Sequence, residues 1–174
     1  LYAMWLPNPD AMFIETNKNY RYTEESGDYK VFSKTPATGG ITANGKNSMI
    51  INVTFSLDKI ITDNIQYIIG AQDNSGYELY VNGDDIAFGI WNESINAYSN
   101  IVKYDVVKVN SIINVTAIYD GTYMLLYIKE KGQNLYNYAE NEIELTLNQN
   151  SDVPTLLGEN PRKSSNYENQ NNYI

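Results

Sequence analysis

The sequence reads MIINVTFSL from Met49 to Leu57, with an apolar residue at every second position. Successive side chains of a β-strand point to opposite faces of a sheet, so strict alternation over this length predicts a strand with one buried face. The polar residues Asn52, Thr54 and Ser56 lie between the apolar ones and would face the other way. The face expected in the core holds Met49, Ile51, Val53, Phe55 and Leu57.

A second alternating stretch, residues 77–91, contains its own turn signal. Asn82 and Gly83 separate two apolar runs, and Asn-Gly favours the positive φ angles of a tight hairpin turn. The predicted hairpin would turn one set of side chains toward the core, namely Tyr77, Leu79, Val81, Ile86, Phe88 and Ile90. It would turn the other set outward, namely Glu78, Tyr80, Ala87, Gly89 and Trp91.

Further short runs complete the pattern. Asp120 and Gly121 form a second hairpin signal, and no stretch of the chain has the apolar spacing of a long amphipathic helix. Many short strands separated by Gly, Asn and Asp predict an all-β fold, an antiparallel sandwich of two sheets with the jelly-roll arrangement. The additional strands are expected at residues 66–70, 101–109, 112–119, 123–129, 142–147 and 155–158.

The chain has 174 residues, the length of a single domain. Residues 1–45 mix short apolar pieces with turns rich in Pro and Gly, and we expect a lead-in segment with one or two edge strands there. Residues 46–174 are expected to form the sandwich. We expect a polar loop at residues 164–174, which are rich in Asn, Ser and Tyr.

Residue counts exclude several kinds of chemistry within this chain. It has no His and no Cys, so it supplies no imidazole base, no Ser-His-Asp triad, no disulfide and no thiolate ligand. Its net charge is -9 and its Lys and Arg are scattered, which argues against nucleic acid and anionic membranes as partners. No apolar run approaches the roughly 18 residues of a membrane span, so membrane insertion is not expected.

Three stretches, taken in order, carry a family resemblance. They are IINVTFSL at residues 50–57, GYELYVNG at 76–83 followed by IAFGI at 86–90, and NVTAIYDG at 114–121 with MLLYI at 124–128. Together they resemble a laminin-G-like domain of the concanavalin A-like lectin and glucanase superfamily, and LLG at residues 156–158 resembles the strand that closes the family's core. The resemblance implies a further long strand after that one. We expect this closing strand to be absent from the chain or replaced by another segment.

The outward face of the predicted hairpin is the first candidate ligand site. Trp91 and Tyr80 beside Glu78 would offer a ring to the apolar face of a sugar and a carboxylate to its hydroxyl groups. Tyr98 and Tyr104 lie in or beside the predicted loop after Trp91 and join this ligand-binding set. The alternative, which we weigh more heavily, is that Trp91 covers an apolar strip or packs beneath a loop.

Glu140, Glu142 and Glu144 alternate along the predicted strand 142–147 and the residues before it, so all three would point to one face. Similar acidic alternation occurs in glycosidases of the resembled superfamily. The aromatic and Asp residues expected around such a motif are missing, and Ile143 and Leu145 account for the pattern as the buried face of a strand. We therefore predict no catalytic residues and no enzymatic activity.

Acidic and amide residues also occur in the predicted turns. Asp73, Asn74, Asp84, Asp85 and Asp120 are typical turn residues because their side chains bond to nearby backbone. No dense metal-binding loop is present, so no metal site and no cofactor are predicted, with calcium left open. The triplets that match the glycosylation pattern, from which nothing is inferred, begin at Asn52, Asn92 and Asn114.

These observations predict a non-catalytic carbohydrate-binding or adhesion module displayed outside the cell, on a cell surface or on a virus or phage particle. A glycan or surface polysaccharide is the expected ligand, and other subunits or domains of a larger assembly are the expected protein partners. A structural module without a small-molecule ligand is the alternative. A glycoside hydrolase is the remaining and least favoured hypothesis.

Overall fold

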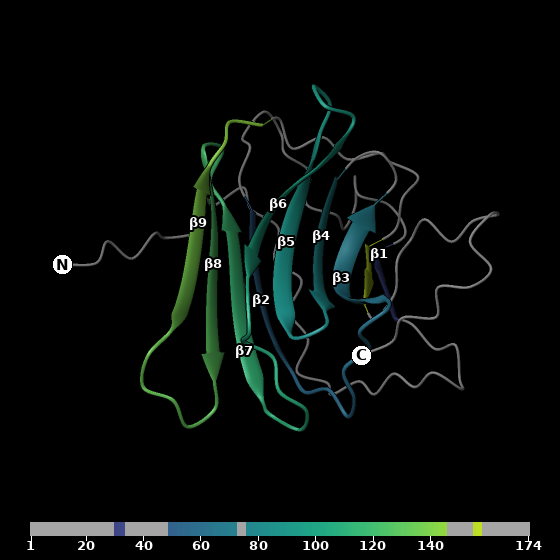
Figure 1. Cartoon of the computed structure of the whole chain (residues 1–174). Helices are drawn as coiled ribbons and strands as arrows, with labels where there is room; N and C mark the ends of the chain where they lie inside the picture. The colour runs from purple at the N-terminus through teal and green to yellow at the C-terminus, as the bar shows by residue number, and fades with distance from the viewer. Residues whose placement is uncertain (1–29, 34–48, 73–75, 146–154, 158–174) are drawn as a thin grey trace.

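The computed structural model describes residues 30–33, 49–72, 76–145 and 155–157, and these residues form two antiparallel sheets packed face to face (Figure 1). No helix occurs among them, and accordingly none of these residues belongs to a helix that could span a membrane. The predicted all-β sandwich is confirmed.

The larger sheet has six strands in the order β1-β10-β3-β4-β5-β6. Its strands are β1 (Lys30–Ser33), β10 (Thr155–Leu157), β3 (Ile65–Gln72), β4 (Gly76–Asn82), β5 (Asp85–Asn92) and β6 (Ala97–Lys103). β1 lies at one edge and comes from the stretch where lead-in edge strands were expected. It pairs with β10, which comes from near the other end of the sequence and also pairs with β3.

The smaller sheet has four strands in the order β2-β7-β8-β9. Its strands are β2 (Met49–Phe55), β7 (Ile113–Tyr119), β8 (Tyr123–Glu130) and β9 (Asn137–Glu142). β7 and β8 are joined at Asp120 and Gly121, as the hairpin signal predicted, and Gly121 has a φ of 102°. The Asp120 carboxylate accepts hydrogen bonds from the backbone N–H groups of Thr122 and Tyr123.

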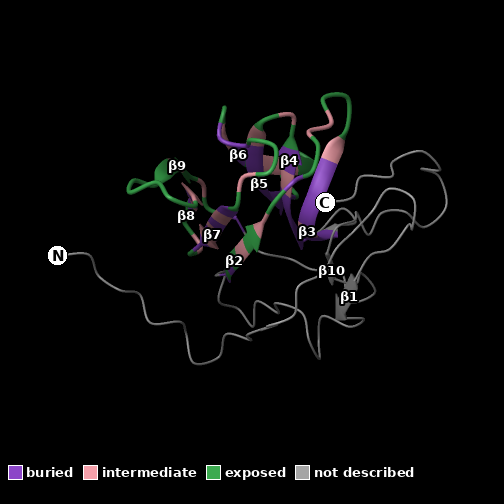
Figure 2. Cartoon of the chain, turned by 90° about the horizontal axis from the view of Figure 1, so that it is seen from below, coloured by how far each residue is buried: buried purple, intermediate pink, exposed green. Residues whose placement is uncertain are grey.

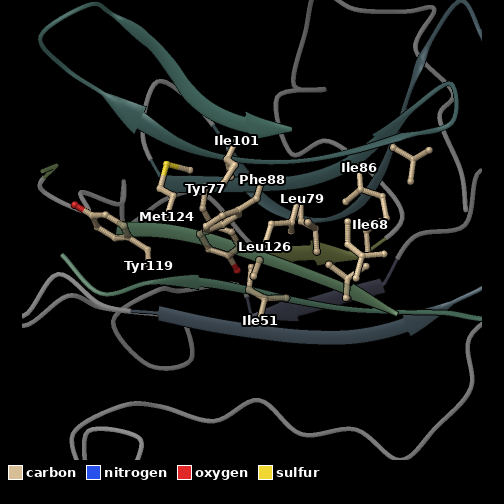
Figure 3. Packing of buried hydrophobic residues seen from close by; sticks show 14 of the residues in the cluster. Ile51, Ile68, Tyr77, Leu79, Ile86, Phe88, Ile101, Tyr119, Met124 and Leu126 are labelled. Atoms are coloured by element: carbon tan, nitrogen blue, oxygen red, sulfur yellow. The ribbon is translucent and has the colours of Figure 1, made fainter. Parts of the chain in front are cut away.

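The core lies between the two sheets, where apolar side chains from both inner faces interdigitate (Figure 3). The whole inward set of the predicted hairpin is buried there, with no member more than 1% exposed. From the smaller sheet the core receives Ile113, Val115, Ala117, Tyr119, Met124, Leu126 and Ile128. Burial of one large apolar side chain contributes about 1.5–3 kcal/mol, so this layer supplies much of the favourable free energy of folding.

Two predicted strands differ from the structure. The strand expected at residues 101–109 is β6 at Ala97–Lys103, and the chain then leaves the sheet because Asp105 and Asn110 have φ angles of 57° and 62°. The strand expected at residues 142–147 is instead β9 at Asn137–Glu142, which ends where the prediction began. Residues 73–75, 146–154 and 158–174 lie outside the described residues, and so does the polar loop expected at 164–174.

Candidate binding surfaces

The first candidate site lies on the outer face of the six-stranded sheet. In the β4–β5 register Glu78 pairs with Gly89 and Tyr80 pairs with Ala87. Trp91 follows Gly89 by two residues along β5 and shares this face. The prediction that Glu78, Tyr80 and Trp91 face the same side of the hairpin is therefore confirmed.

Tyr98 joins this face, whereas Tyr104 does not. Tyr98 was expected in a loop but belongs to β6, where it pairs with Trp91, and the two rings meet nearly edge to face at 5.2 Å between centroids. Tyr104 follows the far end of β6 and is 66% exposed. Six residues of extended chain span about 20 Å, so Tyr104 lies well away from the Trp91 ring.

This face is more enclosed than an open aromatic site would be. Trp91 is 6% exposed and Glu78 is 5% exposed, while Tyr80 is half-buried. Figure 2 shows long stretches of β3, β4 and β5 coloured as buried. Trp91 therefore presents little ring surface to solvent, as the packing alternative anticipated, and a ligand-binding role for Glu78, Tyr80, Trp91, Tyr98 and Tyr104 stays a prediction.

The space above Gly89 is filled by neighbouring side chains. A Cβ added at Gly89 would overlap the Asn100 side-chain oxygen and lie 2.9 Å from Glu78 Cγ. Asn100 pairs with Gly89 from β6, and Glu78 pairs with it from β4. The glycine thus lets an amide and a carboxylate converge from both sides over one backbone position.

Burial, reinforced by the negative charge of Glu78, raises the pKa of Tyr80 from 10.0 to about 12. The folded state therefore favours the protonated phenol, and the resulting stability is present below pH 10.0 and lost as the pH rises through about 12. We expect the difference in tyrosinate absorbance between the wild type and Tyr80→Phe to titrate near pH 12. A Glu78→Gln change should lower that midpoint, and a midpoint unchanged from 10.0 in the folded wild type would contradict the arrangement.

The outer face of the four-stranded sheet carries a second candidate surface, which the sequence analysis missed. We call it the tyrosine face and define it as Tyr123, Tyr127, Tyr136 and Tyr138. Tyr127 on β8 pairs with Tyr138 on β9, with ring centroids 5.0 Å apart, and the Tyr136 ring meets Tyr127 edge-on at 6.5 Å. Tyr136 is 55% exposed and Tyr138 is 41% exposed, so these rings are open to solvent.

Charged groups flank the tyrosine face at opposite ends. The Lys129 ammonium lies 4.9 Å from the centre of the Tyr136 ring, close enough for a cation–π contact. At the other end the Tyr138 hydroxyl donates a hydrogen bond to the Glu140 carboxylate. The negative charge of Glu142, which pairs with Tyr123 across the strands, is the main reason that the pKa of Tyr123 is raised.

Glu140 and Glu142 both belong to β9 and lie on its outer face, whereas Glu144 follows the strand. All three are exposed. The carboxylates of Glu140 and Glu142 thus stand on an open sheet surface beside tyrosine hydroxyls.

The same outer face carries an uncharged ladder on β2 and β7. Two of the three glycosylation-like triplets lie in antiparallel register, so that Asn52 pairs with Thr116 and Thr54 pairs with Asn114. The Asn52 side-chain amide donates to the Thr116 hydroxyl at 2.6 Å, and the Asn114 amide donates to the Thr54 hydroxyl at 2.9 Å. These side chains therefore stabilise the pairing of β2 with β7.

Three carboxylates, two at the turn between β4 and β5 and one from the segment after β6, could hold a hard cation. The oxygens of Asp84, Asp85 and Asp105 lie within 4.8 Å of one another, and oxygen ligands of this kind suit calcium. The Asp105 N–H donates to the Asp85 carboxylate at 3.0 Å, and the Val106 and Val107 N–H groups donate to the Asp84 carbonyl. These bonds account for the loop geometry without an ion, and the expectation of no metal site, with calcium left open, stays untested.

The fold of this chain is an all-β antiparallel jelly-roll sandwich, similar to the fold of laminin-G-like and concanavalin A-like domains. No family model and no curated protein matches its sequence. Solved structures do match, among them domains LG4-5 of the mouse laminin alpha1 chain, with a TM-score of 0.57 and 10% identity over 83% of this chain and 35% of that one. This chain thus spans about a third of the laminin structure.

Another similar structure is the CBM40 domain of Ruminococcus gnavus IT-sialidase, solved bound to alpha2,3 sialyllactose. It has a TM-score of 0.53 and 12% identity, and the match covers 80% of this chain and 83% of that chain. The binding domain of botulinum neurotoxin DC, solved with rat synaptotagmin II, matches at a TM-score of 0.50 and 18% identity over 69% of this chain and 30% of that one. At these identities the likeness concerns the fold.

A signal for the tyrosine face does exist in the sequence. Tyr123, Tyr127 and Lys129 lie at alternate positions of the predicted strand 123–129, on the face opposite its core residues. Tyr136 and Tyr138 continue the alternation that leads into Glu140. Extending the period of two backward from the glutamates would have placed these tyrosines on the same exposed face.

Proposed function

We propose that this chain is a non-catalytic, lectin-like module that binds carbohydrate through the tyrosine face. The observation that carries the proposal is the contact of the Tyr127 ring with the exposed rings of both Tyr136 and Tyr138. Aromatic rings cover the apolar face of a pyranose, and flanking polar groups fix its orientation. The fold supports the proposal, since the similar CBM40 domain was solved with a sialylated sugar.

The groups around the rings suit hydroxyl-bearing ligands. The Glu140 carboxylate can accept hydrogen bonds from sugar hydroxyl groups, and the tyrosine hydroxyls can both donate hydrogen bonds to them and accept hydrogen bonds from them. The surface is an open sheet face, so we expect monovalent affinity in the millimolar range, about -4 kcal/mol. Several copies displayed together would raise the apparent affinity.

The proposed setting is extracellular, on a cell surface or on a virus or phage particle, where many copies could face a glycan or polysaccharide. Other subunits or domains of that assembly are the proposed protein partners. The module is proposed to need no catalytic residues of its own. A structural role without a sugar ligand is the competing hypothesis.

The test is a screen of glycans and surface polysaccharides with a multimerised form of the chain. We expect Tyr127→Ala and Tyr138→Ala each to weaken binding at least about fivefold, since one lost aromatic contact is worth on the order of 1 kcal/mol or more. Ile95→Ala is the control, because Ile95 is an exposed apolar residue in the turn between β5 and β6 and belongs to neither candidate binding surface.

Variants of the six-stranded sheet distinguish the two candidate surfaces. If Tyr80→Ala and Trp91→Ala abolish binding without unfolding the chain, while Tyr127→Ala and Tyr138→Ala do not, the ligand binds the Trp91 face and the tyrosine face is the wrong site. No binding across the screen would favour the structural hypothesis.

A further inference from the structure

β9 forms an open edge of the four-stranded sheet. Within the described parts of the chain it pairs with β8 and with no second strand. Every residue of β9 is exposed except Ala139, which is half-buried. An edge strand of this kind presents a row of backbone N–H and C=O groups with which another extended chain can pair.

The side chains of β9 restrict which chain could pair with it. Glu140 and Glu142 stand two residues apart on the outer face, so their spacing of about 6.8 Å equals the side-chain repeat of any strand laid beside them. A hydrogen bond from the Tyr138 hydroxyl already restricts the Glu140 carboxylate. Less side-chain entropy is therefore lost when a partner binds. The Tyr138 ring offers a cation a second favourable contact.

We propose that β9 accepts an extended basic segment of a partner protein as an added strand, with Lys or Arg at alternate positions facing Glu140 and Glu142. Opposite charges across neighbouring strands stabilise their pairing, and like charges destabilise it. A second copy of this chain is therefore a poor partner, because two β9 strands would oppose their own glutamates in a molecule of net charge -9. The β2 edge does not share this preference, because Asn52 and Thr54 on its outer face are uncharged and bonded to β7.

The test uses a fluorescent peptide with alternating Lys and Thr, together with a Glu-Thr peptide of the same length. Fluorescence anisotropy should show saturable binding of the Lys-Thr peptide, weakened by added salt, and no binding of the Glu-Thr peptide. Glu140→Gln combined with Glu142→Gln should weaken binding at least about tenfold, since both carboxylates that would face the Lys side chains of the peptide lose their charge. Asp63→Asn combined with Asp84→Asn removes the same charge from exposed residues elsewhere and should leave the affinity within about twofold.

A second peptide separates strand addition from simple charge attraction. N-methylation at alternate residues of the Lys-Thr peptide keeps its charges but removes the N–H groups that would face β9, so binding should be lost. Amide exchange should slow in β9 when the unmodified peptide binds and should not change in β2. Absence of binding, equal binding of the methylated peptide, equal loss in the Asp63/Asp84 control, or protection of β2 instead of β9 would each overturn the proposal.

Discussion

Replacing Gly76 by alanine is expected to lower the free energy of unfolding by about 3 kcal/mol or more, because two costs add at one position. Gly76 has a φ of 69°, a conformation that a residue with a side chain adopts at a cost of about 1–2 kcal/mol. A Cβ there would also overlap the backbone carbonyl oxygen of Ala71 in β3, and a backbone group of a buried strand cannot move aside as a side chain can.

Gly83 provides the matched control for this prediction. Its φ is 63°, but an added Cβ would meet nothing within 4 Å. Gly83→Ala should therefore cost only the backbone strain, about 1 kcal/mol. Urea denaturation followed by tryptophan fluorescence compares the two variants, and equal losses of stability would show that the close approach to Ala71 is not the cause.

Replacing Tyr119 by phenylalanine is expected to lower the free energy of unfolding by about 3 kcal/mol, although the ring stays the same size. The Tyr119 hydroxyl lies within the core and accepts a hydrogen bond from the Leu145 N–H at 2.6 Å. It also lies 2.6 Å from the Leu145 carbonyl and 3.0 Å from the Gly121 carbonyl, to which it can donate. Loss of the oxygen would leave buried backbone groups of Leu145 without a partner.

Tyr104→Phe serves as the comparison because Tyr104 is 66% exposed and its hydroxyl can bond to water. Its loss of stability should stay within about 0.5 kcal/mol. Thermal denaturation measures both variants, and proton exchange at the Leu145 amide reports on the bond itself. If Tyr119→Phe unfolds like Tyr104→Phe, the Tyr119 hydroxyl does not fix the segment after β9.

The strands that the sequence predicted well are those with one buried face and a local turn signal. The alternation from Met49 to Leu57 and the Asn82-Gly83 hairpin meet both conditions, and their inward residues are those found in the core. β9 meets neither condition, because almost all of its residues are exposed on both faces. Its position is fixed by pairing with β8, a contact that a single sequence does not display.

The strand predicted at residues 101–109 extends too far, since β6 ends at Lys103, and the reason is related. Val107 and its neighbours continue the apolar pattern of β6, but Asp105 turns the chain out of the sheet, and bonds to the Asp84 carbonyl hold it there. The acceptor belongs to a turn about 20 residues earlier, so the apolar pattern of residues 101–109 could not indicate these hydrogen bonds.

For the candidate surfaces, too, the sequence predicted features that depend on the local strand and did not predict those that depend on distant parts of the chain. Period two correctly placed Glu78 and Trp91 on one face, because that result depends only on the strand. Their burial depends on what packs above the sheet, and the sequence analysis could not evaluate it. Tyr136 and Tyr138 were missed because the stretch before Glu140 lacks the apolar face by which strands are recognised.

The pairing of β1 with β10 determines how this module would respond to mechanical tension. Lys30 stands opposite Leu157, so force transmitted along the chain from before β1 and after β10 would pull two adjacent residues directly apart. The force would then act on the hydrogen bonds between these strands one after another, and each would break before the next was loaded. β1 and β10 would peel away under modest force, and the two sheets around the core would stay closed.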